Sequence, residues 1–147
     1  MHKTERLVLH IDDDRLMTEI VRERLAPLGY HTIPVNDPSN VVELLVRHNC
    51  RVVLLDVQMP QANGLEVLTQ IKQYDGGVLV IMLTGLVSMT SVLESMRRGA
   101  EACLFKPVSD MRPVTMALEA AFVKIDHWWN TLEDLTSRRR EERLVSQ

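Results

Sequence analysis

Short apolar runs alternate with longer amphipathic stretches along most of this chain, and that alternation restricts its possible folds more than any other feature. Five runs are too short for most helices, and several are rich in β-branched residues, which indicates strands buried on both faces. They are Leu7–Ile11, His31–Val35, Val52–Leu55, Val78–Leu83 and Ala102–Phe105. Repeated strand–helix alternation predicts the α/β class, with a doubly wound, five-stranded parallel sheet and right-handed crossovers.

The stretches between these runs carry apolar residues at helical spacing. The first stripe is expected to stop at Gly29, and Asp37-Pro38 is expected to cap the second helix. The four stripes comprise Leu16, Ile20, Val21, Leu25 and Leu28; Val41–Arg47; Leu65, Leu68 and Ile71; and Val92, Leu93 and Met96. Each stripe supplies the apolar face that a helix needs to pack on the sheet.

Length, composition and charge favour a soluble domain with an appendage. The chain has 147 residues, and its hydrophobic fraction of 46% and charged fraction of 25% are ordinary for a globular protein. The net charge of −3 gives no overall attraction to nucleic acid or to an anionic membrane. We therefore expect no direct nucleic-acid partner and no membrane partner.

The cysteines and the absence of long apolar segments predict a cytoplasmic location. Cys50 and Cys103 match no zinc or redox spacing and have apolar neighbours, so we expect buried free thiols, as in a reducing compartment. No apolar run approaches the roughly 20 residues that span a bilayer. The polar residues 1–6 do not resemble a secretory signal.

Polar side chains follow four of the five predicted strands. Asp12-Asp13-Asp14 follows the first, Asp56 the third, Thr84 the fourth and Lys106 the fifth, whereas Val35-Asn36 after the second offers nothing comparable. In a doubly wound sheet the ligand site lies beyond the carboxyl ends of the strands. Clustered carboxylates suit a hard cation such as Mg²⁺, and the lysine and threonine suit a phosphoryl group.

Each of these polar residues also has an ordinary structural explanation. Asp14 is as well explained by capping a helix as by binding a ligand, and a lone aspartate after a strand is usually a cap. Thr84 before Gly85 could be a turn residue, and Lys106-Pro107 could lie in a surface loop. Their coincidence at the same edge of one sheet favours the functional interpretation.

The ordered set of motifs resembles the CheY-like receiver domain of two-component response regulators over residues 5–126. The motifs are the strand leading into Asp12-Asp13, Asp56 followed by Met59-Pro60 and Gly64, Leu83-Thr84-Gly85, Gly99-Ala100, and Lys106-Pro107. No single motif is decisive, but their order and separations are specific. The resemblance implies a flavodoxin-like, CheY-like sheet. The apolar spacing after it predicts an extended C-terminal helix over residues 127–147.

The resemblance also implies the chemistry of the site. Asp56 is expected to accept a phosphoryl group from a phosphohistidine on a histidine kinase or a histidine phosphotransfer protein. Lys106 is expected to pair with a phosphoryl oxygen, and Thr84 to donate a hydrogen bond to the phosphate. Such a protein is a signalling domain that catalyses its own aspartate phosphorylation and dephosphorylation, and not an enzyme that acts on other substrates.

The resemblance further assigns the ligands of Mg²⁺. Asp13 and Asp56 are expected to bind the ion directly, and Asp12 mainly through water. The backbone carbonyl of Gln58 is expected to complete the protein ligands. The Lys106–Pro107 peptide is expected to be cis, again because the family has it so.

This chain departs from the family pattern at Cys103, where receivers usually carry a tyrosine or phenylalanine that swings inward on phosphorylation. A thiol lacks the volume of that ring, so the usual readout is in question here. We hypothesise that Phe105, which lies on the same strand face as Cys103 if the strand is regular, takes over part of the switch. Gln58 and Leu86 are expected to flank the route of the water that hydrolyses the phosphate.

The apolar pattern of the last helix continues past the expected end of the receiver. We expect that helix to begin near Ser109-Asp110, with Pro113 in its first turn. Spacings of four and three then continue over Val114, Leu118, Ala121, Ile125, Trp128, Leu132 and Leu135, as in a coiled coil. Beyond Ile125 no sheet is expected to cover the stripe, so we predict a homodimer through this helix or a contact with a fused output domain.

Two other functions remain open from the sequence alone. The first is a phosphatase with an aspartate nucleophile, which would prefer a second acid two residues further on, whereas Asp56 is followed by Val57-Gln58. Asp12 and Asp14 have that spacing, but Asp14 is followed by Arg15-Leu16, so the pattern is incomplete. The second is a pseudo-receiver scaffold that never accepts phosphate, which the complete acid–threonine–lysine set disfavours.

Overall fold

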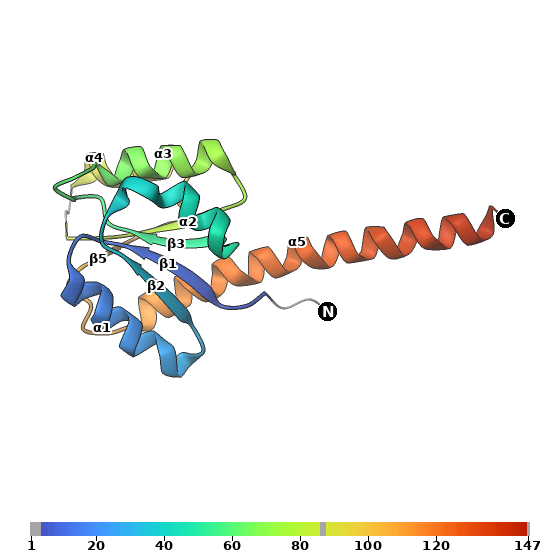
Figure 1. The fold of residues 1–147 in the computed structure, drawn as a ribbon, viewed down its shortest axis with the longest axis horizontal. Coiled ribbons are helices and arrows are strands. Elements are labelled where there is room, and N and C mark those ends of the chain that lie inside the picture. Colours follow the sequence, from blue (N-terminus) through green and yellow to red (C-terminus); the bar gives the residue numbers. More distant parts are fainter. Residues whose placement is uncertain (1–3, 86–87, 147) are drawn as a thin grey trace.

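The protein folds as a five-stranded parallel sheet with helices on both faces, as the strand–helix alternation predicted (Figure 1). The computed structural model describes residues 4–85 and 88–146. The strands are β1 (Leu7–Ile11), β2 (His31–Val35), β3 (Val52–Leu55), β4 (Leu79–Thr84) and β5 (Ala102–Phe105). Their order across the sheet is β2-β1-β3-β4-β5, which places β1 and β3 side by side near its centre.

Five α-helices and two short 3₁₀ turns connect the strands within the described residues. They are α1 (Arg15–Leu25), η1 (Ala26–Leu28), η2 (Pro38–Asn40), α2 (Val41–His48), α3 (Gly64–Tyr74), α4 (Met89–Arg97) and α5 (Arg112–Val145). Helices α1 and α5 cover one face of the sheet, and α2 and α3 pack on the other (Figure 1). Each face has its own apolar core, so the central strands are buried on both sides.

Several element boundaries differ from the predictions for local reasons. The first helix gives way to a 3₁₀ turn after Leu25 because Pro27 has no N–H to continue the helical hydrogen bonds, and Gly29 at φ 91° then ends the segment. Asp37 caps the 3₁₀ turn Pro38–Asn40 instead of α2. Strand β4 runs one residue later than predicted at both ends, which makes Thr84 its last residue.

Helix α5 is one continuous helix of 34 residues, about 50 Å long at the usual rise per residue. It begins at Arg112 and not at Ser109-Asp110, with Pro113 in its first turn as predicted. The residues that pack on the sheet are Val114, Leu118, Ala121, Phe122 and Ile125. The second half projects away from the body of the protein (Figure 1).

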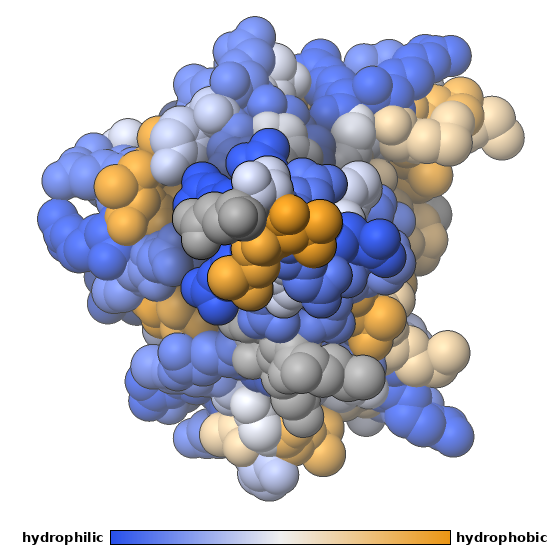
Figure 2. Space-filling view, turned by 90° about the vertical axis from the view of Figure 1, so that its right-hand side faces the viewer, coloured by the Kyte–Doolittle hydropathy of each residue, from blue (hydrophilic) through white to orange (hydrophobic). Residues whose placement is uncertain are grey.

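The surface on the side toward which α5 projects is mostly hydrophilic, with separate hydrophobic patches (Figure 2). In residues 4–85 and 88–146, no helix is both long enough and apolar enough to cross a membrane.

Candidate functional site

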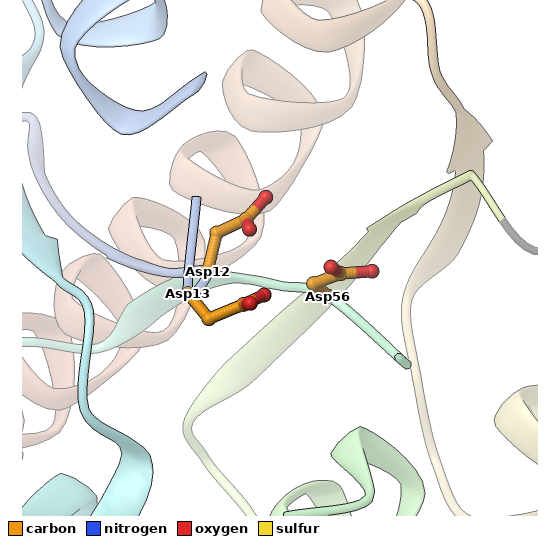
Figure 3. A group of neighbouring side chains, drawn as sticks. All are labelled: Asp12, Asp13 and Asp56. Atoms are coloured by element: carbon orange, nitrogen blue, oxygen red, sulfur yellow. The ribbon is translucent and has the colours of Figure 1, made fainter. Parts of the chain in front are cut away.

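Three carboxylates meet where β1 and β3 end. Asp12 and Asp13 follow β1 and Asp56 follows β3, and each offers an oxygen within 4.8 Å of the others (Figure 3). Backbone hydrogen bonds continue the sheet past the strands and hold the loops in place. The N–H of Asp56 donates to the carbonyl of Ile11 at 3.0 Å, and the N–H of Asp12 donates to that of Val35 at 3.0 Å.

Lys106 reaches this cluster from the end of β5. Its Nζ lies 2.5 Å from Asp12 Oδ2 and 3.3 Å from Asp56 Oδ2. Burial by itself lowers the pKa of Lys106, but the hydrogen bond to Asp12 and the charges of Asp12 and Asp56 raise it above the ordinary 10.5. The side chain therefore carries a positive charge at neutral pH. The Lys106–Pro107 peptide is cis, which confirms that prediction.

The cluster has an excess of negative charge. Three carboxylates face one ammonium group, while Asp12 is fully buried and Asp56 is 5% exposed. Like charges in a poorly solvated site repel one another unless a cation or a proton compensates them. The donor set consists of oxygen atoms only, which is the set that Mg²⁺ prefers, so the residues fit that ion.

Asn36, at the end of β2, is a part of the site that the sequence did not reveal. Its Nδ2 donates to the backbone carbonyl of Asp12 at 2.9 Å and to Thr18 Oγ1 at 3.1 Å. Because Asp12 is held from its backbone, its carboxylate points at Lys106 while the loop stays fixed to α1. Only a polar residue directly after a strand marked this position in the sequence.

The backbone around Asp56 requires a glycine at the start of α3. A Cβ on Gly64 would lie 1.9 Å from the carbonyl oxygen of Asp56 and 2.7 Å from the Cα of Val57. The N–H of Gly64 donates to the Val57 carbonyl at 2.7 Å, which fixes α3 against the loop. Within that loop, the N–H of Gln58 donates to Asp56 Oδ1 at 3.3 Å and orients the carboxylate.

Asp14 lies outside the carboxylate cluster. Its side chain caps α1 by accepting hydrogen bonds from the N–H groups of Leu16 at 3.0 Å and Met17 at 3.2 Å. This is the capping role that the sequence allowed as an alternative to ligand binding. It leaves Asp14 unsuited to serve as the second acid of a phosphatase.

The end of β4 contributes Thr84 beside Lys106. Thr84 is 1% exposed, and its carbonyl accepts a hydrogen bond of 2.9 Å from the N–H of Lys106. Across the β4–β5 ladder Thr84 is the register partner of Phe105, so a shift of Thr84 would also displace β5. Leu86, which was expected near the path of the hydrolytic water, lies outside the described residues.

The position of the usual switch aromatic is only partly buried. Cys103 packs against the core on the α2–α3 face but is intermediate in exposure, so the prediction of a buried thiol was wrong for it and right for Cys50. Strand β5 is an edge strand, which explains the exposure. Burial raises the pKa of the Cys103 thiol above 9.0, so it is no reactive thiolate. Phe105 is 44% exposed.

A buried histidine that no sequence motif indicated lies on β1 beneath the cluster. His10 is fully buried two residues before Asp12, and neither ring nitrogen has a hydrogen-bond partner among the described residues. Burial lowers its pKa to about 4, the charge of Lys106 lowers it too, and Asp56 opposes both. His10 is therefore neutral, and adds no charge to the site at neutral pH.

Comparisons with known proteins agree with this geometry. The model of the response regulator receiver domain family matches residues 8–118. CpxR of Escherichia coli (strain K12), a transcriptional regulatory protein, is 33% identical over 121 residues, which are 82% of this chain and 50% of CpxR. The response regulator MprA of Mycobacterium leprae is 32% identical over 100 residues, 68% of this chain and 44% of MprA. The chain thus spans about half the length of these relatives or less.

Solved structures give the same fold. A CheY-like receiver domain protein from Methanospirillum hungatei JF-1 superposes with a TM-score of 0.76 over 82% of this chain and 96% of that one, at 22% identity. A chain of the CheX-CheY-BeF3-Mg complex from Borrelia burgdorferi superposes with a TM-score of 0.73 at 26% identity, over 79% of this chain and 88% of that one.

Proposed function

This chain belongs to the response regulator receiver domain family, and from that premise we propose that it is a phosphorylation-dependent switch with Asp56 as the phosphoryl acceptor. The observation that carries the proposal is the cluster at the sheet edge, where three carboxylates meet one lysine. Asp13 is the most accessible of the three acids. A phosphoryl group can therefore approach the cluster from solvent on that side.

The proposed step transfers a phosphoryl group between two proteins. A carboxylate oxygen of Asp56 attacks the phosphorus of a phosphohistidine, the phosphorus–nitrogen bond breaks, and an acyl phosphate forms on Asp56. The electron pair of the broken bond stays on the imidazole of the donor. A histidine kinase or a histidine phosphotransfer protein is the donor. The hydrogen bond from the Gln58 N–H to Oδ1 leaves the other oxygen, Oδ2, facing Lys106.

The residues around Asp56 balance the charge of the incoming group. The ammonium group of Lys106 contacts both Asp12 and Asp56. On phosphorylation it exchanges the contact with Asp56 for a phosphoryl oxygen and balances the charge of that oxygen. Mg²⁺ held by Asp13, Asp56 and the Gln58 carbonyl, with Asp12 bound through water, would supply positive charge against the transferring oxygens. The Thr84 hydroxyl donates a hydrogen bond to the phosphate, and its movement is passed to β5 through Phe105.

The C-terminal extension transmits the phosphorylation state of Asp56 to the partner of the switch. We assign residues 5–126 to the receiver and residues from 127 onward to a helical extension that pairs with a second copy as a coiled coil, or contacts a fused output domain. Support comes from the apolar stripe of α5, which continues past the end of the sheet. The protein acts in the cytoplasm and contacts neither nucleic acid nor membrane directly.

Incubation with acetyl phosphate and Mg²⁺, followed by intact-protein mass spectrometry, tests the site. We expect the mass of one phosphoryl group to be added to the wild-type chain and to be absent when EDTA replaces Mg²⁺. Asp56→Asn should abolish the addition, because an amide cannot form the acyl phosphate. Asp14→Asn is the matched control, since asparagine retains the helix cap.

Two outcomes would contradict the proposal. Undiminished phosphorylation of Asp56→Asn would place the acceptor elsewhere, and no phosphorylation of the wild-type chain by acetyl phosphate or by a histidine kinase panel would favour the pseudo-receiver. Lys106→Ala should still accept phosphate, but more slowly, because it lacks the cation that balances the transferring group.

A further inference from the structure

The second half of α5 exposes an apolar stripe, and three arginines followed by two glutamates come directly after it. Trp128, Leu132 and Leu135 are 62%, 49% and 45% exposed and continue the spacing of the buried residues before them. Next come Arg138, Arg139 and Arg140, and then Glu141 and Glu142. A stripe of this kind on a projecting helix is stable in water when another helix covers it.

A parallel pair of these helices would bring like charges together. With Trp128, Leu132 and Leu135 at the seam, the next seam position is Arg139, which would face Arg139 of a second copy. Flanking positions five residues apart also meet in a parallel pair, so Arg138 would face Arg143 of the second copy. Both contacts are repulsive, and only the three exposed seam residues Trp128, Leu132 and Leu135 oppose them.

An antiparallel pair avoids these contacts. If Leu132 of one copy lies opposite Leu135 of the other, then Trp128 lies opposite Arg139 at both ends of the pair. A guanidinium over an indole ring is a favourable cation–π contact.

We infer that two copies of this chain pair their α5 extensions in an antiparallel arrangement centred between Leu132 and Leu135. The pattern fits a second copy better than an unrelated partner because it is complementary to itself about that centre, as a two-fold symmetric interface requires. The inference rests on the proposed pairing of α5 with a second copy. It adds that the two Asp56 sites lie at opposite ends of the assembly, so each receiver is phosphorylated without contact with the other.

Distances between spin labels distinguish the two orientations. A nitroxide on Ser146→Cys, in a chain with Cys50 and Cys103 replaced by alanine, should give an interchain separation of about 40 Å in the antiparallel pair, from the helical rise alone. In a parallel pair the two labels would lie side by side. Double electron–electron resonance measures the separation, and sedimentation on the same sample measures the dimer.

The two proposals fail in different ways in this experiment. A sample that is monomeric at tens of micromolar removes the pairing itself and leaves the phosphorylation site untouched. A dimer with adjacent labels removes only the antiparallel orientation. A dimer with labels about 40 Å apart supports the inference.

Charge variants of the otherwise intact chain give a second, independent test. Arg139→Glu should raise the dissociation constant about tenfold or more, because two cation–π contacts are lost. Arg138→Gln is the matched control, since Arg138 faces the uncharged Thr131 in the antiparallel register. Its dissociation constant should stay unchanged, whereas a tighter dimer would reveal the parallel repulsion and overturn the inference.

Discussion

The two halves of α5 have the same apolar spacing but opposite surroundings. Leu118 in the first half is fully buried against the sheet, whereas Leu132, two heptads further on, is 49% exposed. Both halves belong to one unbroken helix. The comparison teaches that a heptad pattern marks a face that needs to be covered, while the tertiary structure decides whether the same chain provides the cover.

The boundary between the halves is held by contacts with the first residues of the described chain. Asp126 accepts a hydrogen bond of 2.5 Å from the N–H of Thr4 and pairs with Arg6 at 3.2 Å. Further along the helix, the guanidinium of Arg51 lies 6.0 Å from the ring centre of Trp129. Trp129 is therefore a docked residue, unlike its neighbour Trp128.

Alanine substitutions of Leu118 and Leu132 should differ most in the free energy of unfolding. Leu118→Ala should lower the free energy of unfolding by about 3 kcal/mol, because it leaves a cavity in a packed core. Leu132→Ala, measured at a concentration where the chain is monomeric, should change it by less than about 0.5 kcal/mol. Urea denaturation followed by circular dichroism gives both values. Equal losses would mean that α5 is covered equally along its length.

The buried layer beneath α1 and α5 should respond to pH through His10. The pKa of His10 is about 4 in the folded chain and about 6.5 when unfolded, so the unfolded chain binds the extra proton between these values. Stability should therefore fall as pH decreases from 6.5 to 4, by about 3 kcal/mol from this residue.

Two variants isolate this pH effect. His10→Leu should remove that part of the pH dependence, and at neutral pH it should be no less stable than the wild type, because two unpaired ring nitrogens leave the core. Leu132→Ala, in the exposed half of α5, is the control and should retain the wild-type slope because it changes no titratable group. An unchanged slope in His10→Leu would contradict the assignment.

The polar contacts at the boundary should matter less than the core. Asp126→Asn should cost about 1 kcal/mol, because it weakens charge-assisted hydrogen bonds to Thr4 and Arg6 that are partly shielded from water. Asp134→Asn removes an exposed pair with Arg138 at 2.9 Å and should cost clearly less than Asp126→Asn, because solvent screens the pair. Thermal denaturation of the two variants side by side measures the difference, and equal costs would remove the special role of the boundary.

The smallest expected effect concerns the two tryptophans. Trp129→Leu should lower stability by about 0.5 kcal/mol through loss of the contact with Arg51, and Trp128→Leu should have no measurable effect on the monomer. Hydrogen exchange supplies the sharper measurement. Amides just after Asp126 should exchange faster in Trp129→Leu only, and faster exchange in both variants would show that Trp129 is not docked.

Much of the fold could be predicted because its signals are local. The apolar runs gave all five strands to within one residue, and the parallel sheet followed from their alternation with helices. Asp12, Asp13, Asp56 and Lys106 each follow a strand, and they meet because parallel strands end at one edge. The family's catalytic roles for these residues remain predictions.

Other features of the site could not be predicted because they depend on distances between strands. The amide of Asn36 is just another polar group in the sequence, and only the β1–β2 pairing brings it to the backbone of Asp12. Likewise, the preference of Lys106 for Asp12 over Asp56 depends on how far its side chain crosses the sheet.

Periodicity and strand order, which are properties of the chain, already indicate which residues become strands, which edge of the sheet carries the acids, and which face of α5 is apolar. Three-dimensional packing sets the rest: His10 is enclosed with no hydrogen-bond partner among the described residues, Cys103 is half-exposed on an edge strand, and the cover of α5 ends near Asp126. Burial depends on what packs opposite a residue. Its neighbours along the chain do not fix that.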